Sequence, residues 1–387
     1  MSNLLLLYSL LPGLSKIFDS SIFFALNLLI ILILFYRGSY DKLNINRLAF
    51  SAVFLMLLIF QIFVSFISNS NFMFESFYSS FYIWIIPILG IYLADIYDKD
   101  ELCKAMVKVS IVHSLIGFVI YGFFPLPSFL QFYANKLLEG VAYFRMSSVA
   151  GSLIFSSIVS CGFNCHIYLM HEKVKSSNIN YLDWITLVLL FLAVLLSLQR
   201  SAWIAILPAL LLFTLSNKKV FIFISIISVP IFTLISWFVF NNDFYYTRLM
   251  TLFSSDYNPV DERFGIWLNG IEQFSNNIFG LGIGQSGQFA YKAGVSIKHY
   301  ITDGDYIKIV SEGGLIFLFF YLLISLNVIR VFFKKIKYDL LGSSFLLFIV
   351  TGFYLQMIGS NISEYYFVNF VFWVFIGVFC HNDRKIR

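Results

Sequence analysis

The sequence predicts an all-α protein that crosses a membrane about twelve times, at about 20 apolar residues per span. Hydrophobic residues make up 59% of the chain and charged residues only 12%, whereas soluble domains are about 25% charged. The mean hydropathy is +0.84. The 387 residues include only 7 prolines, which suits long helices, because lipid requires backbone groups to bond internally.

Apolar runs of the length that crosses a bilayer define the expected spans in order. They lie at residues 3–17, 20–36, 48–68, 77–96, 104–123, 148–170, 183–199, 201–216, 219–240, 303–330, 339–358 and 363–380. The first is short, and the seventh and eighth form a tight hairpin. We expect transmembrane helices 1–9 in residues 1–240, a large loop at 241–302, and helices 10–12 with a cytoplasmic tail in residues 303–387.

The distribution of basic residues sets the orientation. Most of the 26 Lys and Arg fall on one side if both termini are cytoplasmic, as the positive-inside rule requires. The loop at 241–302 then lies outside, together with residues 124–147. No cleavable signal peptide is evident, because the start lacks a basic region and a small-residue cleavage site. The net charge of +5 is dispersed, so we expect no nucleic acid partner.

Four arginines lie on the outer side, against this bias: Arg145, Arg200, Arg248 and Arg263. A guanidinium group presents a planar fork that binds phosphate oxygens in pairs. The four side chains are therefore candidates for binding a phosphate-containing substrate. Snorkelling or a surface ion pair is the alternative for each of them.

The large outer loop contains an amphipathic stretch and a glycine cluster. Asn258 and Pro259 provide a cap and a first helical residue. Apolar residues then recur at helical spacing, at Phe264, Trp267, Leu268, Ile271 and Phe274. We expect a short helix in the outer interface or packed on the spans.

The glycines that follow match G-x-G-x-x-G at Gly282, Gly284 and Gly287. We reject a dinucleotide fold, since no strand or βαβ unit surrounds the motif. A turn whose backbone N–H groups face an anion and a plain turn both remain.

Ionisable residues cluster where the tenth span begins. Asp305, Lys308 and Glu312 share one face at helical spacing. Charges near the membrane centre are costly, about 2.5 kcal/mol or more each. They form either a self-neutralising helix end or one side of a water-filled cavity. In the last outer turn, Asn361 and Glu364 are candidates for glycan binding.

Two cysteines, Cys161 and Cys165, are four residues apart beside His166. We interpret them as apolar filler of a span rather than as a metal site. We expect no disulfide, no metal and no cofactor.

Three segments resemble a known family. ERFGIWLNGIEQFSNNIFGLGIG, DGDYIKIVSEGGLIFLFFYLLI and SLQRSAWIAILPALLL are similar to the O-antigen polymerase and ligase superfamily, over roughly residues 190–330. The resemblance implies a GT-C-like fold in a bacterial inner membrane, with the active site facing the periplasm. It also implies a glycosyltransferase that uses a glycan on undecaprenyl pyrophosphate as its donor.

Polymerases of that superfamily move the growing chain onto a new lipid-linked repeat unit, whereas ligases move the glycan to lipid A–core. The implied partners are the lipid-linked donor and acceptor, membrane lipid and a chain-length regulator. Ligases resemble the pattern His-Asn-x-Tyr-x(5)-Glu-x-Gly. Counting back from Glu312, Asp303 stands at the His position, and His299 lies four residues earlier. The departure favours a polymerase over a ligase.

The resemblance also suggests roles for the outer charges. We expect catalytic roles for Asp303, Arg200 and Arg263. We expect substrate-binding roles for Arg145, Arg248, Asp305, His299, Glu312 and Glu364. Asp303 is the preferred base, with Asp305, Glu312 and His299 as competitors. A lipid-linked oligosaccharide flippase is the alternative of another class, although it would place its charges deep within the spans rather than at their outer ends.

Overall fold

The computed structural model describes residues 2–14, 45–68, 74–94, 98–122, 145–176, 178–216, 277–287 and 304–380, with isolated positions between these ranges. Every regular element among them is helical, as the sequence predicts. The helices are α1 (Ser2–Leu14), α3 (Ile45–Ser68), α4 (Phe74–Leu93), α5 (Lys99–Gly122), α7 (Ser152–Lys175), α8 (Tyr181–Leu196), α9 (Arg200–Ser216), α14 (Asp305–Lys335), α15 (Leu340–Gly359), the 3-10 helix η3 (Ile362–Glu364) and α16 (Tyr366–Cys380).

These helices lie close to predicted spans. Within the described ranges, four are long and apolar enough to cross a membrane, in α5, α7, α14 and α15, and shorter apolar helices accompany them. The expected hairpin is present, because α8 ends at Leu196 and α9 begins at Arg200. The predicted spans at 20–36 and 219–240 lie largely outside the described residues, so the total of twelve and the orientation remain predictions.

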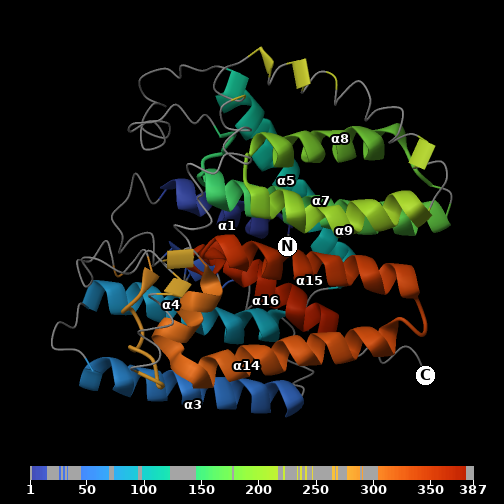
Figure 1. The fold of residues 1–387 in the computed structure, drawn as a ribbon. Helices are drawn as coiled ribbons and strands as arrows, with labels where there is room; N and C mark the ends of the chain where they lie inside the picture. The colour runs from blue at the N-terminus through green and yellow to red at the C-terminus, as the bar shows by residue number, and fades with distance from the viewer. Residues whose placement is uncertain are drawn as a thin grey trace.

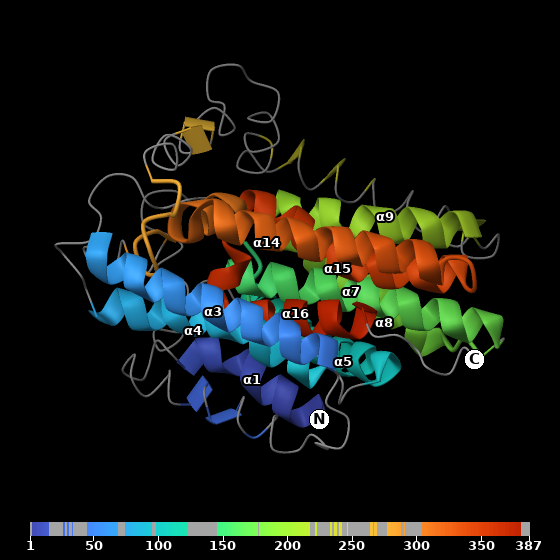
Figure 2. The ribbon, with the colours of Figure 1, turned by 90° about the horizontal axis from the view of Figure 1, so that it is seen from below.

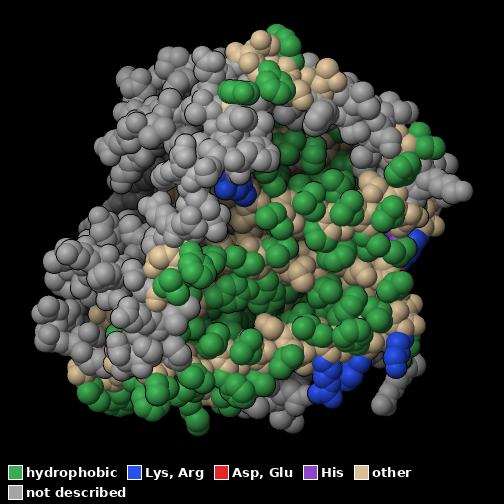
Figure 3. Space-filling model, viewed as in Figure 1, with side chains coloured by type: hydrophobic (Ala, Val, Ile, Leu, Met, Phe, Trp, Pro, Cys, Tyr) green, Lys and Arg blue, Asp and Glu red, His purple; other side chains and the backbone are tan. Residues whose placement is uncertain are grey.

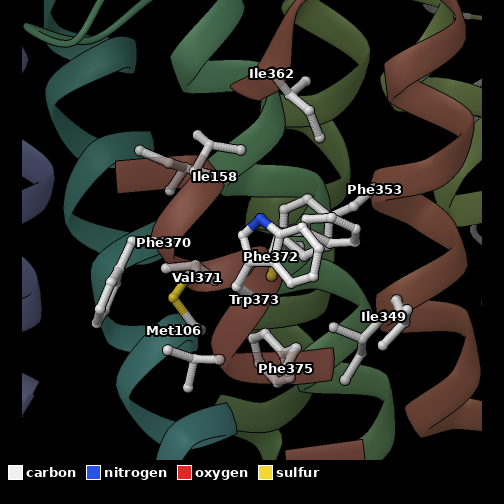
Figure 4. Packing of buried hydrophobic residues seen from close by; sticks show 14 of the residues in the cluster. Met106, Ile158, Ile349, Phe353, Ile362, Phe370, Val371, Phe372, Trp373 and Phe375 are labelled. Carbon is white, nitrogen blue, oxygen red and sulfur yellow. The ribbon is translucent and has the colours of Figure 1, made fainter. Parts of the chain in front are cut away.

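The helices pack side by side in one bundle, with α16 near its centre (Figures 1 and 2). The sequence of α16 is apolar all round, which is typical of a fully buried helix. Trp373 is completely buried, and its ring lies 5.3 Å from Phe372 and 5.4 Å from Tyr321. Figure 4 shows this aromatic packing, to which Phe353 of α15 contributes.

Polar side chains join α7 to α9 and α15 inside the bundle. Asn164 of α7 donates to the carbonyl oxygens of Ala205 and Phe348, at 3.1 and 3.2 Å. One turn earlier, Ser160 accepts a 3.0 Å hydrogen bond from Gln356 of α15. Interhelical hydrogen bonds of this kind stabilise helix packing in lipid.

The outer surface of the bundle is broadly apolar. Figure 3 shows one face, where hydrophobic side chains cover most of the described surface and Lys and Arg gather at a few places. Large side chains of α3 and α14 point outward, among them Met56, Phe63, Ile67, Phe319 and Leu326. A continuous apolar surface of this kind is expected to face lipid rather than water.

A small cluster of ion pairs lies at the end of the bundle where α7 finishes. Lys173 bonds to Asp183 of α8 at 2.5 Å, and Lys175 bonds to Asp339 at 3.2 Å. Asp339 caps the start of α15. The predicted orientation assigns this end to the cytoplasm.

Candidate active site

The long helix α14 is broken at Gly314, about two and a half turns after it begins at Asp305. Gly314 has φ 64° and ψ −162°, a left-handed conformation that glycine adopts without strain. An ideal Cβ at this position would overlap the backbone of the 277–287 loop, at 2.6 Å from the nitrogen of Gly280. The break therefore requires glycine both for its conformation and for the close approach of this loop.

The 277–287 loop supplies the hydrogen bonds that the broken helix loses. Leu281 N–H donates to the carbonyl of Ser311 at 2.7 Å, and Gly282 N–H donates to the carbonyl of Glu312 at 3.1 Å. In return, Leu315 N–H donates to the carbonyl of Ile278 at 3.0 Å. Irregular backbone is tolerated at membrane depth only where such partners are present.

Two polar residues of α3 hold the same loop. Gln61 donates to the carbonyls of Phe279 and Gly313, at 2.9 and 3.0 Å. The hydroxyl of Ser65, one turn later, accepts a 2.6 Å hydrogen bond from Ile283 N–H. The loop, orange in Figures 1 and 2, is thereby fixed between α3 and the start of α14.

The glycine turn faces an anion, and that anion is a side chain of the protein itself. The carboxylate of Glu312 is fully buried. It accepts a 2.7 Å hydrogen bond from the indole N–H of Trp84, and longer bonds from Gly284 N–H (3.2 Å) and Ser286 N–H (3.4 Å). Backbone N–H groups that converge in a turn form an anion-binding concavity, and the Glu312 carboxylate occupies this one.

The other charges near the start of α14, Asp305 and Lys308, are also buried. Lys308 forms a 2.7 Å ion pair with Glu364 of η3, and both side chains are almost completely buried. Asp305 accepts hydrogen bonds from the backbone N–H of Ser363, at 2.9 Å, and from its hydroxyl. The Lys308 ammonium also interacts electrostatically with Glu312 and Asp305. One ammonium group thus forms an ion pair with one carboxylate and interacts electrostatically with two more.

The turn after α15 connects to the α8–α9 hairpin. Gln199 donates a 3.3 Å hydrogen bond to the hydroxyl of Ser360, and it accepts one from Ser156 of α7. The next residue, Arg200, is partly exposed at the first position of α9. Gln199 therefore fixes the start of α9 against α7 and the end of α15.

The same turn binds the residue that follows Asp303. The side-chain oxygen of Asn361 accepts a 2.9 Å hydrogen bond from Gly304 N–H. Ser360 and Asn361 are neighbours, so this turn brings Arg200 and the start of α14 to one place. Arg200 and Asp303 are each adjacent in sequence to a residue that the turn binds.

Helical residues of the 241–302 segment also reach this place. Trp267 is helical, and an ideal Cβ on Gly304 would lie 3.4 Å from its indole nitrogen. Gly304 has φ 140°, where glycine is favoured. The adjacent Phe264 and Leu268 are helical and exposed, and the rest of the predicted amphipathic helix lies outside the described residues.

Arg145 lies beside the α8–α9 hairpin. The N–H of the next residue, Met146, donates a 3.0 Å hydrogen bond to the carbonyl of Leu196, the last residue of α8. Leu198, inside the hairpin, has φ 51°, an uncommon conformation for such a side chain. Arg145 and Arg200 therefore flank one tight connection, and both are partly exposed.

The structure describes five of the nine predicted site residues and brings them to one end of the bundle. These are Arg145, Arg200, Asp305, Glu312 and Glu364. The other four, Asp303, Arg248, Arg263 and His299, lie outside the described residues.

Sequence reasoning missed the groups that hold this end together. Gln61 and Ser65 carried a signal, because polar residues four positions apart in an apolar span are rare and usually face the protein interior. Trp84 carried none, since it is one of many aromatic residues in apolar spans.

Comparison with known protein families gives a match to part of the chain. The sequence model of the O-antigen ligase family matches residues 185–322. Over these residues the chain is similar to the O-antigen polymerase/ligase superfamily. No curated protein matches the chain. The members of the superfamily are glycosyltransferase-like enzymes, polymerases or ligases.

The superfamily match runs from α8 through the break in α14. It includes Arg200 and the 277–287 loop, and it leaves Arg145 and Glu364 outside. Glu364 is tied to the matched segment through its ion pair with Lys308, and the residue after Arg145, Met146, is tied to it through a hydrogen bond to Leu196. Together with the apolar helices, the match indicates a multi-pass protein of a bacterial inner membrane in lipopolysaccharide biosynthesis.

Proposed function

We propose that the protein is an O-antigen polymerase, which transfers a growing glycan from undecaprenyl pyrophosphate onto a new lipid-linked repeat unit at the periplasmic face. The observation that carries the proposal is the turn at Ser360 and Asn361, which holds both Gln199 and Gly304. These two hydrogen bonds support a position of Arg200 near the start of α14, and Asp303 directly precedes Gly304 in the sequence. A cation and a carboxylate at one membrane surface suit glycosyl transfer from a lipid pyrophosphate.

In the proposed reaction an acceptor hydroxyl attacks the anomeric carbon of the donor glycan. The new glycosidic C–O bond forms as the bond to pyrophosphate breaks, and the hydroxyl proton passes to the base. Lipid pyrophosphate is a good leaving group, so the site must chiefly stabilise the charge that develops on it. Each charge-assisted hydrogen bond contributes about 1.5–3 kcal/mol.

We assign that stabilisation to arginines. Arg200 and Arg263 contact the pyrophosphate, and Arg145 and Arg248 bind pyrophosphate or glycan nearby. A guanidinium group offers paired donors to phosphate oxygens. The partial exposure of Arg145 and Arg200 leaves them accessible to a substrate from the lipid surface.

We assign the base to Asp303, with His299 as the competitor. Asp305 and Glu312 are less suited, because their carboxylates are buried and already accept hydrogen bonds from Ser363, Trp84 and the glycine turn. A base needs hydrogen-bond reach to the substrate hydroxyl. Asp305, Glu312 and Glu364 instead support the site from within the bundle.

Asp303 also favours a polymerase over a ligase, since it stands where the resembling ligase pattern has histidine. The flippase alternative is disfavoured, because the superfamily consists of glycosyltransferase-like enzymes. The test is a lipopolysaccharide gel from a deletion strain. Loss of a polymerase leaves core carrying a single repeat, whereas loss of a ligase leaves core alone with accumulated lipid-linked polymer. An unchanged ladder would contradict both functions.

A further inference from the structure

His113 lies in α5, outside the group of charges described above, and its imidazole is completely buried. Its Nδ1 lies 2.6 Å from the hydroxyl of Ser148, and its Nε2 lies 2.9 Å from the hydroxyl of Ser9 in α1. A buried histidine that uses both nitrogens joins three parts of the chain. One of them is the segment 145–151, which carries Arg145.

The direction of these hydrogen bonds follows from the serine hydroxyls. Ser9 donates its proton to the carbonyl of Leu6 at 2.6 Å, so it accepts from Nε2–H of His113. A neutral imidazole has one donor and one acceptor, hence Nδ1 accepts from the hydroxyl of Ser148. The Ser148 oxygen in turn accepts the Ala150 N–H at 3.3 Å. The ring therefore has one defined tautomer.

The segment 145–151 is clamped between α5 and the α8–α9 hairpin. Gly151 N–H donates to the carbonyl of Ser148 at 3.0 Å. Met146 is completely buried, and its terminal methyl lies 2.8 Å from where a Cβ on Gly117 of α5 would be. Its N–H bonds to Leu196 of the hairpin. His113 adds the side-chain connection from α5 to this segment.

We propose that His113 is a positioning residue, which through Ser148 holds Arg145 beside Arg200 for binding of the lipid-linked pyrophosphate. The identity of the substrate in this inference rests on the proposed function. The hydrogen bond that ties His113 to the segment carrying Arg145 is independent of that function. A guanidinium group stabilises a phosphate only from a fixed place, and a displacement of about 1 Å at a reacting centre costs roughly 100-fold in rate.

The two sides of the ring are separable by substitution. In His113→Asn the amide reaches the Nδ1 position and keeps the bond to Ser148, whereas in His113→Gln it reaches the Nε2 position and keeps the bond to Ser9. We expect His113→Ala, His113→Gln and Ser148→Ala to slow glycan polymerisation by about 10- to 100-fold. His113→Asn and Ser9→Ala stay within a few-fold of the unmodified protein. Equal rescue by Asn and Gln would overturn the proposal.

A double-mutant comparison tests whether the effect passes through Arg145. His113→Ala combined with Arg145→Ala should be no slower than Arg145→Ala alone, because residues that act through one another are not additive. Losses that multiply would show that His113 acts elsewhere. The comparison uses variants that elute as the unmodified protein does in detergent, and His113→Asn keeps the test available if His113→Ala does not fold.

A second measurement needs no glycan. Arg145→Cys, in a chain whose four native cysteines are replaced by serine, is labelled with a membrane-impermeant maleimide in membrane vesicles. We expect His113→Ala and Ser148→Ala to change the labelling rate of position 145 several-fold, and His113→Asn to leave it as it is. An unchanged rate in all variants overturns the positioning role. If polymerisation is absent even from the unmodified protein but labelling changes as expected, the polymerase assignment fails and the positioning role stands.

Discussion

Lys308 and Glu364 form a 2.7 Å ion pair across 56 positions of sequence, and both side chains are almost completely buried. The pair joins α14 to the turn between α15 and α16. That turn also binds Gln199 and Gly304. The position of Arg200 relative to the start of α14 therefore depends on a buried charge pair as well as on helix packing.

Breaking this pair should destabilise the protein strongly. Lys308→Met leaves the Glu364 carboxylate buried without its ammonium partner, which costs about 3–5 kcal/mol. The double variant Lys308→Met/Glu364→Gln should regain part of that loss. Thermal unfolding in detergent measures both. The control is Lys175→Met, which removes partly exposed pairs with Glu172 and Asp339 and should cost about 0–1 kcal/mol. If Lys308→Met lowers the stability no more than this control does, the proposed role of the pair is contradicted.

A second prediction concerns the Glu312 carboxylate, which accepts hydrogen bonds from the glycine turn. In Glu312→Gln an amide N–H₂ group must face N–H donors, so at least one hydrogen bond is lost at a cost of about 1–3 kcal/mol. Hydrogen exchange of residues 277–287 should accelerate together with a lower melting temperature. Trp84→Phe removes a single donor and keeps ring packing, so its effect should be smaller. The partly exposed Glu172→Gln serves as the control. Exchange equal to that control would show that Glu312 does not hold the turn.

At the end of the bundle opposite the candidate active site, the charge of Asp339 should make the stability of the protein depend on pH. Partial burial acts to raise the pKa of Asp339, but the hydrogen bonds from Gly342 N–H and Lys175 outweigh it, and the net pKa is lowered. A lowered folded pKa means that the ionised group stabilises the protein above the unfolded pKa of about 3.9, and that this stability is lost as the pH falls through the folded value.

Asp339→Ala should therefore cost about 1 kcal/mol near neutral pH, as loss of a helix cap does. The difference from the unmodified protein should shrink as the pH becomes acidic, when the native carboxylate is protonated too. Chemical unfolding at several pH values measures it. A difference that stays constant across the acid range would mean that the charge of Asp339 plays no part.

The sequence predicts the helices well, because lipid imposes both the length and the apolar character of a span. It predicts the shared face of Asp305, Lys308 and Glu312 from helical spacing alone. It does not predict the break at Gly314, since a glycine pair within an apolar run is equally compatible with an unbroken helix. The break depends on the 277–287 loop, whose backbone replaces the missing hydrogen bonds.

The sequence also does not predict which residues far apart along the chain contact one another. We expected Glu364 to bind glycan, and the structure pairs it with Lys308 instead of leaving it open at the surface. The structure adds Trp84 as a partner of Glu312. No local pattern links α4 to α14, because the link follows from how the helices pack. Of the two interpretations of the glycine turn that the sequence leaves open, the structure favours the anion-facing one, and the anion is the Glu312 carboxylate of the protein itself.

The polymerase assignment and its two principal residues are tested most directly with the purified protein in lipid vesicles, supplied with undecaprenyl-pyrophosphate-linked repeat units alone. We predict that glycans of several repeat units appear without any lipid A–core. Arg200→Ala and Asp303→Asn should abolish this elongation, while the matched variant Lys175→Met retains it. Transfer that begins only when lipid A–core is added would identify a ligase, and normal elongation by both variants would contradict the proposed site.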